Sequence, residues 1–271
     1  MRRAARGVAC GLLCLLPGCA TAPRDPVALE AFRANNDPLE PFNRKVFAFN
    51  ELLDRFIIKP IAQGYLRIVP RAGRDGILNI IKNLNEPVVF ANDALQGEGR
   101  RAAITAGRFV LNSTLGVAGI MDVAGKHGLV RQNGDFGQTL HVWGFDEGPY
   151  LVLPLWGPSN PRDAVGAGVD IYMVPYRYIA DKDNYPSGLS AANTGLGGID
   201  ERSRNIDSLD ELQRESIDYY ASFRSLYRQH RAAEVERGAA PASPTDDLYS
   251  DPGAPAKAGG TGGEADKQKT S

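Results

Sequence analysis

"DPLEPFNRKVFAFNELLDRF", residues 37–56, decides the fold class, because its apolar residues recur at the spacing of an α-helix. They follow one another at intervals of four, three, four and three positions: Phe42, Val46, Phe49, Leu53 and Phe56. A helix brings residues with these intervals into one narrow stripe along its surface. The prolines just before the stripe are typical of a helix start. The stretch therefore predicts an amphipathic helix.

The same helix also carries apolar residues on its other side. Phe47 and Ile58 lie nearly opposite the stripe, between charged neighbours. A helix that is apolar on both sides must be covered on both sides. Two interpretations remain open: both sides pack within the protein, or protein covers the stripe and lipid contacts Phe47 and Ile58.

The rest of the chain is mostly helical in pattern. Further helices are predicted at 74–84, 87–96, 100–111, 161–172 and 208–237, and Pro60 and Pro70 are predicted to kink or break the chain. The uncharged segment "GPYLVLPLWGPSNP", 148–161, contains four prolines and is predicted to be extended, either buried or inserted into a surface. Alternating strand patterns are scarce, so we expect a single all-α domain.

The N-terminus has the three parts of an export signal: the positive residues Arg2, Arg3 and Arg6, a short apolar run from Val8 to Leu16, and Leu16-Pro17-Gly18-Cys19. The last part resembles a bacterial lipobox, in which the cysteine becomes the acylated first residue. We expect a signal peptide at 1–18, a lipid anchor at Cys19 and, because Ala20 follows, attachment to the periplasmic face of the outer membrane.

Composition divides the remaining chain into three parts. Residues 19–36 are predicted to form a tether, and 37–237 the folded domain. Residues 238–271 offer little that could be buried, so a disordered tail is expected there. After Cys19 no uncharged apolar run reaches the ~18 residues that a spanning helix needs.

Several functions are disfavoured by what the sequence lacks. A net charge of −1 and a pI of 6.3 disfavour nucleic acid as a partner. His127, His141 and His230 lack the spacing of a zinc site, and "DKDN", 181–184, lacks the loop of a calcium site. "GEGRRA", 97–102, follows a helix rather than a strand, so its fit to a dinucleotide motif is taken as chance. No metal or cofactor is expected.

Catalysis is also not expected. The candidate groups for a hydrolase are Ser113, Asp135 and His141, but no Gly-x-Ser-x-Gly elbow surrounds any serine. A Walker-type loop is absent, so any transport is expected to be passive or driven by partners.

Six stretches together resemble one family, the MlaA (VacJ) outer-membrane lipoproteins. They run in order from Asp37 to Arg231: "DPLEPFNRKVFAFN", "NEPVVFANDALQG", "GRFVLNSTLGVAGIMDVA", "DFGQTLHVWG", "GPYLVLPLWGPSNPRD" and "DYYASFRSLYRQHR". Tyr219 and His230 depart from the family pattern in the last stretch.

The resemblance implies a ring-like helical domain in the inner leaflet of the outer membrane. Such a protein surrounds an amphipathic channel for misplaced phospholipids, associates with a trimeric porin and delivers lipid to the periplasmic carrier MlaC. The alternatives are a porin-associated structural lipoprotein without lipid transport and, more distantly, a phospholipase. The residues expected to contact membrane or phospholipid are Phe42, Phe47, Phe49, Ile58, Tyr150, Leu151 and Trp156.

Overall fold

The computed structural model describes residues 20–175 and 187–236. The chain divides into two units, 1–238 and 239–271, and all described residues belong to the first. The signal peptide at 1–18, the anchor Cys19, the "DKDN" segment at 181–184 and the tail at 238–271 lie outside the described residues, so their predictions stay predictions.

The described residues are mostly helical. In the first half of the unit the elements are α2 (Pro26–Asn35), α3 (Glu40–Leu53), η1 (Asp54–Ile58), α4 (Lys59–Ile68), α5 (Arg71–Leu95), α6 (Gly99–Thr114) and α7 (Val123–Lys126). In the second half they are α8 (Phe136–Val142), β1 (Leu151–Leu153), β2 (Gly157–Ser159), α9 (Pro161–Met173), α11 (Ser187–Arg204), α12 (Ile206–Glu215) and α13 (Tyr219–Val235). The helix α2 occupies the segment that composition predicted as a tether.

Several helix starts follow ordinary capping chemistry. The carboxylates of Asp25, Asp135 and Asp218 accept backbone N–H bonds at the starts of α2, α8 and α13. Asn160 caps α9 in the same way, directly before Pro161. The cap at Asp218 separates α12 from α13, so the single helix predicted at 208–237 is wrong: Ser216 is extended and the chain restarts at Tyr219.

A π-helical turn joins α3 to α4. In η1 the N–H of Lys59 donates to the carbonyl of Asp54, five residues earlier. Pro60 follows, and it has no N–H to donate to the carbonyl four residues before it, where its ring would also clash. The wider turn lets the chain run on into α4, so Pro60 does not end the helix. Pro70 does, because its extended backbone separates α4 from α5.

The long helix α5 corrects a second prediction. Two helices were expected at 74–84 and 87–96, but α5 continues through Pro87 from Arg71 to Leu95. A proline inside a helix has no backbone N–H to donate, and its ring clashes with the carbonyl group four residues earlier. The next helix α6 packs along α5, and Glu86 and Val88, on either side of Pro87, are both buried. This packing holds the helix together across the proline.

The uncharged segment at 148–161 forms a short antiparallel hairpin, consistent with the extended backbone predicted for it. Leu151 pairs with Ser159, Val152 with Pro158 and Leu153 with Gly157. Val152 is buried, whereas Leu155 at the tip is exposed. The two short strands are the only β-structure in the described part of the chain.

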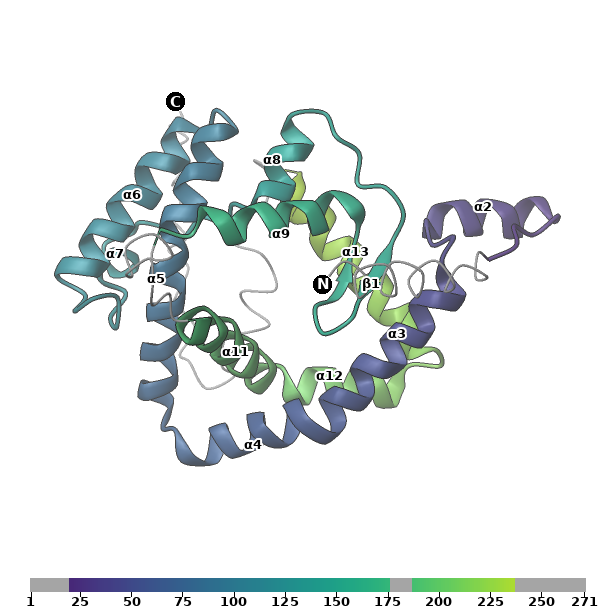
Figure 1. Cartoon of the computed structure of the whole chain (residues 1–271), viewed down its shortest axis with the longest axis horizontal. Coiled ribbons are helices and arrows are strands. Elements are labelled where there is room, and N and C mark those ends of the chain that lie inside the picture. The colour runs from purple at the N-terminus through teal and green to yellow at the C-terminus, as the bar shows by residue number, and fades with distance from the viewer. Residues whose placement is uncertain (1–19, 176–186, 237–271) are drawn as a thin grey trace, which may run out of the picture. The chain divides into compact units, whose positions relative to one another are not determined.

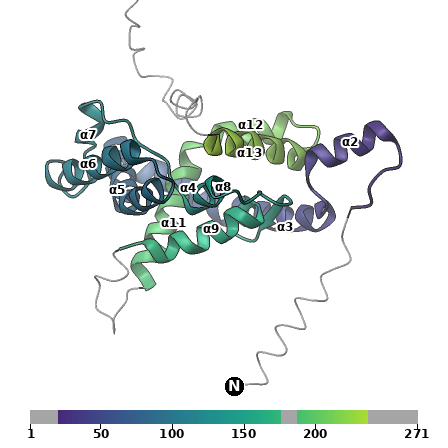
Figure 2. The ribbon, with the colours of Figure 1, turned by 90° about the horizontal axis from the view of Figure 1, so that it is seen from above.

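The helices of the unit make a closed circuit of contacts (Figure 1). From α3 the chain passes through η1 and α4 to α5, which contacts α9. Because β2 leads directly into α9, and β1 packs on α3, the circuit closes on itself. A second series of contacts runs from α4 through α11, α12 and α13 to α8. Figures 1 and 2 both place α6 and α7 at one end of the unit and α2 at the other.

Candidate functional site

Burial in this fold is inverted relative to a water-soluble protein. Among the described residues, more than twice as many polar or charged residues as hydrophobic ones are buried. Large hydrophobic side chains are exposed on nearly every helix. In a soluble domain the usual arrangement is the opposite, so buried polar groups and exposed apolar surface are the informative features.

One buried polar cluster joins the start of α3 to α13. The Asp37 carboxylate accepts hydrogen bonds from Asn43 Nδ2 at 2.8 Å, from the Tyr220 hydroxyl and from Arg224 Nη1 at 2.7 Å. The Asp37 and Arg224 side chains are almost fully buried. Removing one partner of such a pair leaves an uncompensated charge, which costs about 3–5 kcal/mol. The cluster therefore fixes two elements that lie far apart in the sequence.

A second buried cluster joins α5, α6 and the turn before α7. Arg108 donates to Glu86 at 3.1 Å and to both oxygens of Asp122 at 3.1 Å. Arg131 adds a second contact to Glu86 at 3.1 Å. Burial alone would raise the pKa of Asp122, but the Gly125 N–H, Asn112 and Arg108 outweigh it and lower that pKa. Asp122 is thus held ionised.

A third cluster joins α8, α9 and α13 through one arginine. Arg231 donates to both oxygens of Asp135 at 2.8 and 2.9 Å and to Asp163 at 2.8 Å. Burial by itself would raise the pKa of Asp163, but the hydrogen bonds and charge of Arg231 lower it. Three helices therefore share one fixed set of charges.

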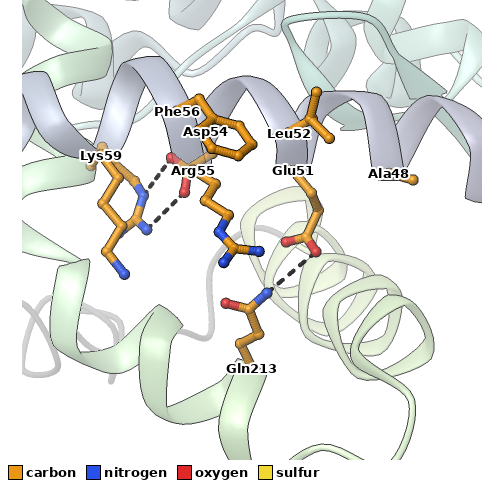
Figure 3. Close-up of a pocket in the computed structure, with 9 residues that line it drawn as sticks. Ala48, Glu51, Leu52, Asp54, Arg55, Phe56, Lys59 and Gln213 are labelled. Atoms are coloured by element: carbon orange, nitrogen blue, oxygen red, sulfur yellow. Dashed lines mark hydrogen bonds and ion pairs between the residues drawn. The ribbon is translucent and has the colours of Figure 1, made fainter.

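A pocket with a volume of about 550 Å³ lies where η1 meets α11 and α12. We call it the η1 pocket. Its polar lining consists of Glu51, Asp54, Arg55, Lys59, Arg202 and Gln213. Apolar lining comes from Ala48, Leu52 and Phe56, of which Phe56 is 66 % exposed. Figure 3 shows Glu51 and Arg55 extending from α3 and η1 toward Gln213 of α12. The pocket is thus amphipathic.

Most charges in the η1 pocket are already paired within the protein. Arg202 donates to the two oxygens of Asp54 at 2.7 and 2.9 Å. Lys59 donates to Asp210 at 2.7 and 2.8 Å. Glu51 accepts only a long bond from the Gln213 amide, at 3.3 Å. Burial, and then the charge of Asp54, raise the pKa of Glu51.

A second, smaller pocket of about 200 Å³ lies between the hairpin and α9. Its lining is mainly apolar and includes Trp156, Ile171 and the small residues Ala164, Ala167 and Gly168. Trp156 is 64 % exposed beside it. A tryptophan with one apolar and one wet side is common where protein meets the edge of a bilayer.

A model of the MlaA lipoprotein family matches residues 35–234, which includes every element named above except α2 and the last residue of α13. This chain belongs to the MlaA lipoprotein family. The match includes the polar clusters and the η1 pocket.

Individual relatives agree with the family match. Proteins named as the intermembrane phospholipid transport system lipoprotein MlaA are 36 % identical to this chain, in Haemophilus influenzae over 209 residues and in Escherichia coli K12 over 219. The alignments cover 75 % and 79 % of this chain and 80 % and 82 % of those proteins. A solved structure described as the structural basis for maintenance of bacterial outer membrane lipid asymmetry shares 36 % identity, with a TM-score of 0.65, and covers 73 % of this chain and 98 % of its own.

Within this MlaA fold the inward face of α3 is not the stripe that periodicity predicted, because Val46 from that stripe and Phe47 from the opposite side both pack against the same core cluster. Phe47, expected to face away from the core, packs its ring 5.4 Å from the rings of Tyr219 and Tyr220. Phe49, expected in the core stripe, is 50 % exposed. The reason is that the inward face of α3 carries Asn43 and Asn50, whose amides bond the hairpin backbone and turn this side of the helix inward.

The other predicted contact residues of this MlaA chain fall into three groups. Tyr150 was expected at a membrane or lipid surface, and this expectation is wrong because its ring is buried against Tyr220 and Tyr227. Trp156 is exposed at the hairpin. Partly buried positions are taken by Phe42, Ile58 and Leu151. These residues come from several elements and do not form one site.

The groups considered for hydrolysis each have another partner. Ser113 accepts a hydrogen bond from Asn83 at 3.0 Å, Asp135 pairs with Arg231, and His141 Nδ1 lies 3.3 Å from Arg162. Over the described ranges, no cluster of three or more His, Cys, Asp or Glu residues could hold a metal ion. In the same ranges no helix has both the length and the apolar content needed to cross a bilayer.

The polar clusters and the η1 pocket were missed by sequence reasoning. Asn83, Glu86, Asp93 and Gln96 recur along α5 at helical spacing and are all buried. A polar stripe is ordinarily taken as the solvated face of a helix. Its residues lie inside the quoted family stretch "NEPVVFANDALQG" or just before it, so the signal was present in the sequence but was given no role.

Proposed function

We propose that this protein is an outer-membrane lipoprotein of intermembrane phospholipid transport. It removes phospholipids misplaced in the outer leaflet through an amphipathic passage and delivers them to a soluble periplasmic carrier. It works without catalysis and without a cofactor, as a conduit for lipid that moves to a more favourable location.

The inverted burial is the single observation that carries this proposal. Exposed apolar side chains on helices too short or too polar to cross a bilayer are suited to contact acyl chains in one leaflet. Charged headgroups cannot pass hydrocarbon without polar partners. A closed circuit of helices, tied together by buried ion pairs and bearing an amphipathic pocket, provides both environments in one domain.

The names of the relatives support the same function. Two of them are named as components of an intermembrane phospholipid transport system, and the solved structure concerns outer-membrane lipid asymmetry. Each of them aligns with most of the folded part of this chain, which supports the proposal that this chain has the same transport function.

The first described residue bears on how the protein is anchored. The N–H of Ala20 donates to the carbonyl of Pro38 at 2.7 Å, which holds the chain beside the start of α3. An acylated Cys19 is the next residue toward the N-terminus. Two or more acyl chains there would keep the domain on its membrane. In this proposal the anchor is Cys19, the membrane is the outer membrane, and the domain lies on its periplasmic face.

Two protein partners complete the proposal. Lipid that leaves the passage must cross an aqueous compartment, which requires a soluble carrier of the MlaC kind. A trimeric porin, as the family resemblance implies, would hold the domain in place beside a barrel. No nucleic acid takes part.

A deletion strain tests the function directly. We expect phosphatidylethanolamine labelled at the cell surface by an impermeant amine reagent to rise severalfold in the deletion strain and to return to the parental level when the gene is restored. Unchanged surface phospholipid, together with altered porin levels, would favour the structural lipoprotein instead. Fatty acid release by the purified protein, abolished by Ser113→Ala, would establish a phospholipase.

A further inference from the structure

The η1 pocket contains two charged groups that the protein leaves without a counter-ion. Arg202, Asp54, Lys59 and Asp210 neutralise one another through the bonds described above. Among the described residues, no carboxylate lies within ion-pair distance of Arg55, whose guanidinium is 5.7 Å from the centre of the Phe56 ring. Glu51 accepts a hydrogen bond from the Gln213 amide, and the nearby Arg202 directs its own hydrogen bonds to Asp54. One cation and one carboxylate that form no ion pair therefore remain open to a ligand.

The local helix geometry explains why these two groups do not pair with each other. In a regular α-helix, a glutamate and an arginine four positions later face one another and form an ion pair. Glu51 lies in the last regular turn of α3, but Arg55 lies in the wider π-turn of η1. The change in winding keeps the two groups apart, although Figure 3 shows both extending from the same side of the helix toward Gln213. Such π-turns occur often at functional sites.

We propose that the η1 pocket binds the zwitterionic headgroup of a phosphoethanolamine lipid, with the phosphate on Arg55 and the ammonium on Glu51. This inference rests on the function proposed above and names the lipid class that one site of the protein recognises. An arginine guanidinium is well suited to phosphate oxygens, and a carboxylate to a primary ammonium.

The rest of the pocket fits a lipid rather than a free headgroup. Its volume of about 550 Å³ lies in the usual range for small-ligand sites. Leu52 and Phe56 are both largely exposed beside the charged groups, so they provide an apolar wall for the glycerol and the first methylenes. An anionic headgroup such as phosphoglycerol would meet Arg55 but would bring no cation to Glu51. The pocket therefore discriminates by charge pattern.

The raised pKa of Glu51 agrees with this assignment. Burial raises that pKa first, and the neighbouring Asp54 carboxylate raises it further. Both effects oppose a negative charge on Glu51 and outweigh the charge of Arg202, which lowers the pKa. An ammonium group supplies the missing positive charge, and Asp54 itself is already occupied by Arg202. A bound ammonium group would thus stabilise the negative charge of Glu51.

The test measures headgroup preference with the full-length protein purified in detergent. The protein is incubated with mixed micelles that contain equal amounts of phosphatidylethanolamine and phosphatidylglycerol, and the bound lipids are quantified by mass spectrometry. We expect Glu51→Gln to lower the bound ratio of phosphatidylethanolamine to phosphatidylglycerol about tenfold, the effect of one lost charge-assisted hydrogen bond. Arg55→Gln should lower the binding of both lipids. Glu51→Lys should invert the preference.

Matched control variants lie on the same helices outside the pocket. Lys45→Gln on α3 and Glu211→Gln on α12 remove exposed charges and should leave the ratio unchanged. Soluble phosphoethanolamine should compete with the lipid in the wild-type protein, whereas inorganic phosphate at the same concentration should compete far less. Equal competition by the two would reduce the pocket to a simple anion site and overturn the assignment of Glu51.

The outcome separates this inference from the proposed function. If Glu51→Gln keeps the wild-type ratio and Arg55→Gln binds both lipids as strongly as the wild type, the headgroup assignment is wrong, and restoration of low surface phospholipid by the same variants would leave the transport function intact. If Glu51→Gln lowers the ratio and Arg55→Gln lowers the binding of both lipids, but deletion of the gene leaves surface phospholipid unchanged, lipid recognition stands and transport does not.

Discussion

Two asparagines determine how α3 meets the hairpin. Asn43 donates to the carbonyl of Tyr150 and accepts from the N–H of Val152, at 3.0 Å each. Seven residues later, Asn50 repeats this pattern with Leu153 and Leu155, at 2.9 Å each. The side chains thereby satisfy the free backbone edge of a short strand, which would otherwise stay unpaired. This requirement turns the asparagine face of α3 inward.

Phe47 shares that inward face and should carry much of the stability of this junction. Phe47→Ala removes a ring in contact with three aromatic side chains, and we expect it to lower the free energy of unfolding in detergent by about 3 kcal/mol. Phe49→Ala, two positions later on the exposed face, should change it by less than about 1 kcal/mol. Chemical denaturation followed by circular dichroism measures both. Equal losses for the two variants would contradict the orientation of α3.

At this scale the sequence predicted that α3 is a helix, but not which of its faces packs against the rest of the protein. The intervals between Phe42 and Phe56 predicted an amphipathic helix, and the helix is there. The rule that an apolar stripe faces the core assumes water on the other side. Here Phe49 and Phe56 of the stripe are exposed, whereas Val46 of the same stripe packs inward beside Phe47, so the intervals did not give the orientation of the helix.

At the scale of elements, the winding of the helices was harder to predict than their positions. Pro60 was predicted to kink or break the chain, and a new helix was predicted to start at Pro87, yet a π-turn accommodates the first proline and α5 continues through the second, packed against α6. Both outcomes depend on neighbours that are distant in sequence. The η1 pocket depends on the π-turn, so local propensity could not indicate it.

The crossing of α8 and α9 offers a sharp test of element packing. A Cβ atom at Gly166 would lie 2.3 Å from the backbone nitrogen of Gly137, so the two helices touch through their main chains. We expect Gly166→Ala to force the helices apart and to lower the free energy of unfolding by about 3 kcal/mol.

Gly168 is the matched control on the same helix. A Cβ there meets nothing within 4 Å, so Gly168→Ala should be neutral or raise stability by up to about 1 kcal/mol through helix propensity. Thermal unfolding of the two variants side by side gives the comparison. A Gly166→Ala protein as stable as Gly168→Ala would show that the crossing is looser than the contact implies.

At the scale of the whole folded unit, polar side chains take the place that a hydrophobic core takes in soluble domains. Asp37 and Arg231 each anchor a cluster that joins segments remote in sequence, and Glu86 anchors one that joins the consecutive helices α5 and α6. Where lipid surrounds the unit, as proposed, apolar surfaces gain little by meeting one another, and ion pairs and hydrogen bonds between helices hold the unit together. Periodicity predicted the all-α fold. It did not predict that polar side chains would be buried and apolar ones exposed, because the rules for reading periodicity assume that water surrounds the protein.

The exposed apolar surface should by itself bind the unit to a bilayer. Ile57, Ile61 and Ile68 lie along η1 and α4, and Ile68 is 82 % exposed. In a Cys19→Ser background, which removes the acyl anchor, we expect the protein to float with phospholipid vesicles in a density gradient. Replacing the three isoleucines by serine removes about 1 kcal/mol of burial each, so partition into vesicles should fall about 100-fold.

The control for this experiment replaces Lys45, Glu211 and Arg214 by serine in the same background, because these side chains are exposed and polar. Their loss should leave partition within a few-fold of the parent. If the isoleucine variant floats as well as the control, α4 does not contact lipid, and the apolar surface of that helix must be covered by protein instead. A porin is then the occupant to test, by repeating the flotation with the porin reconstituted in the vesicles.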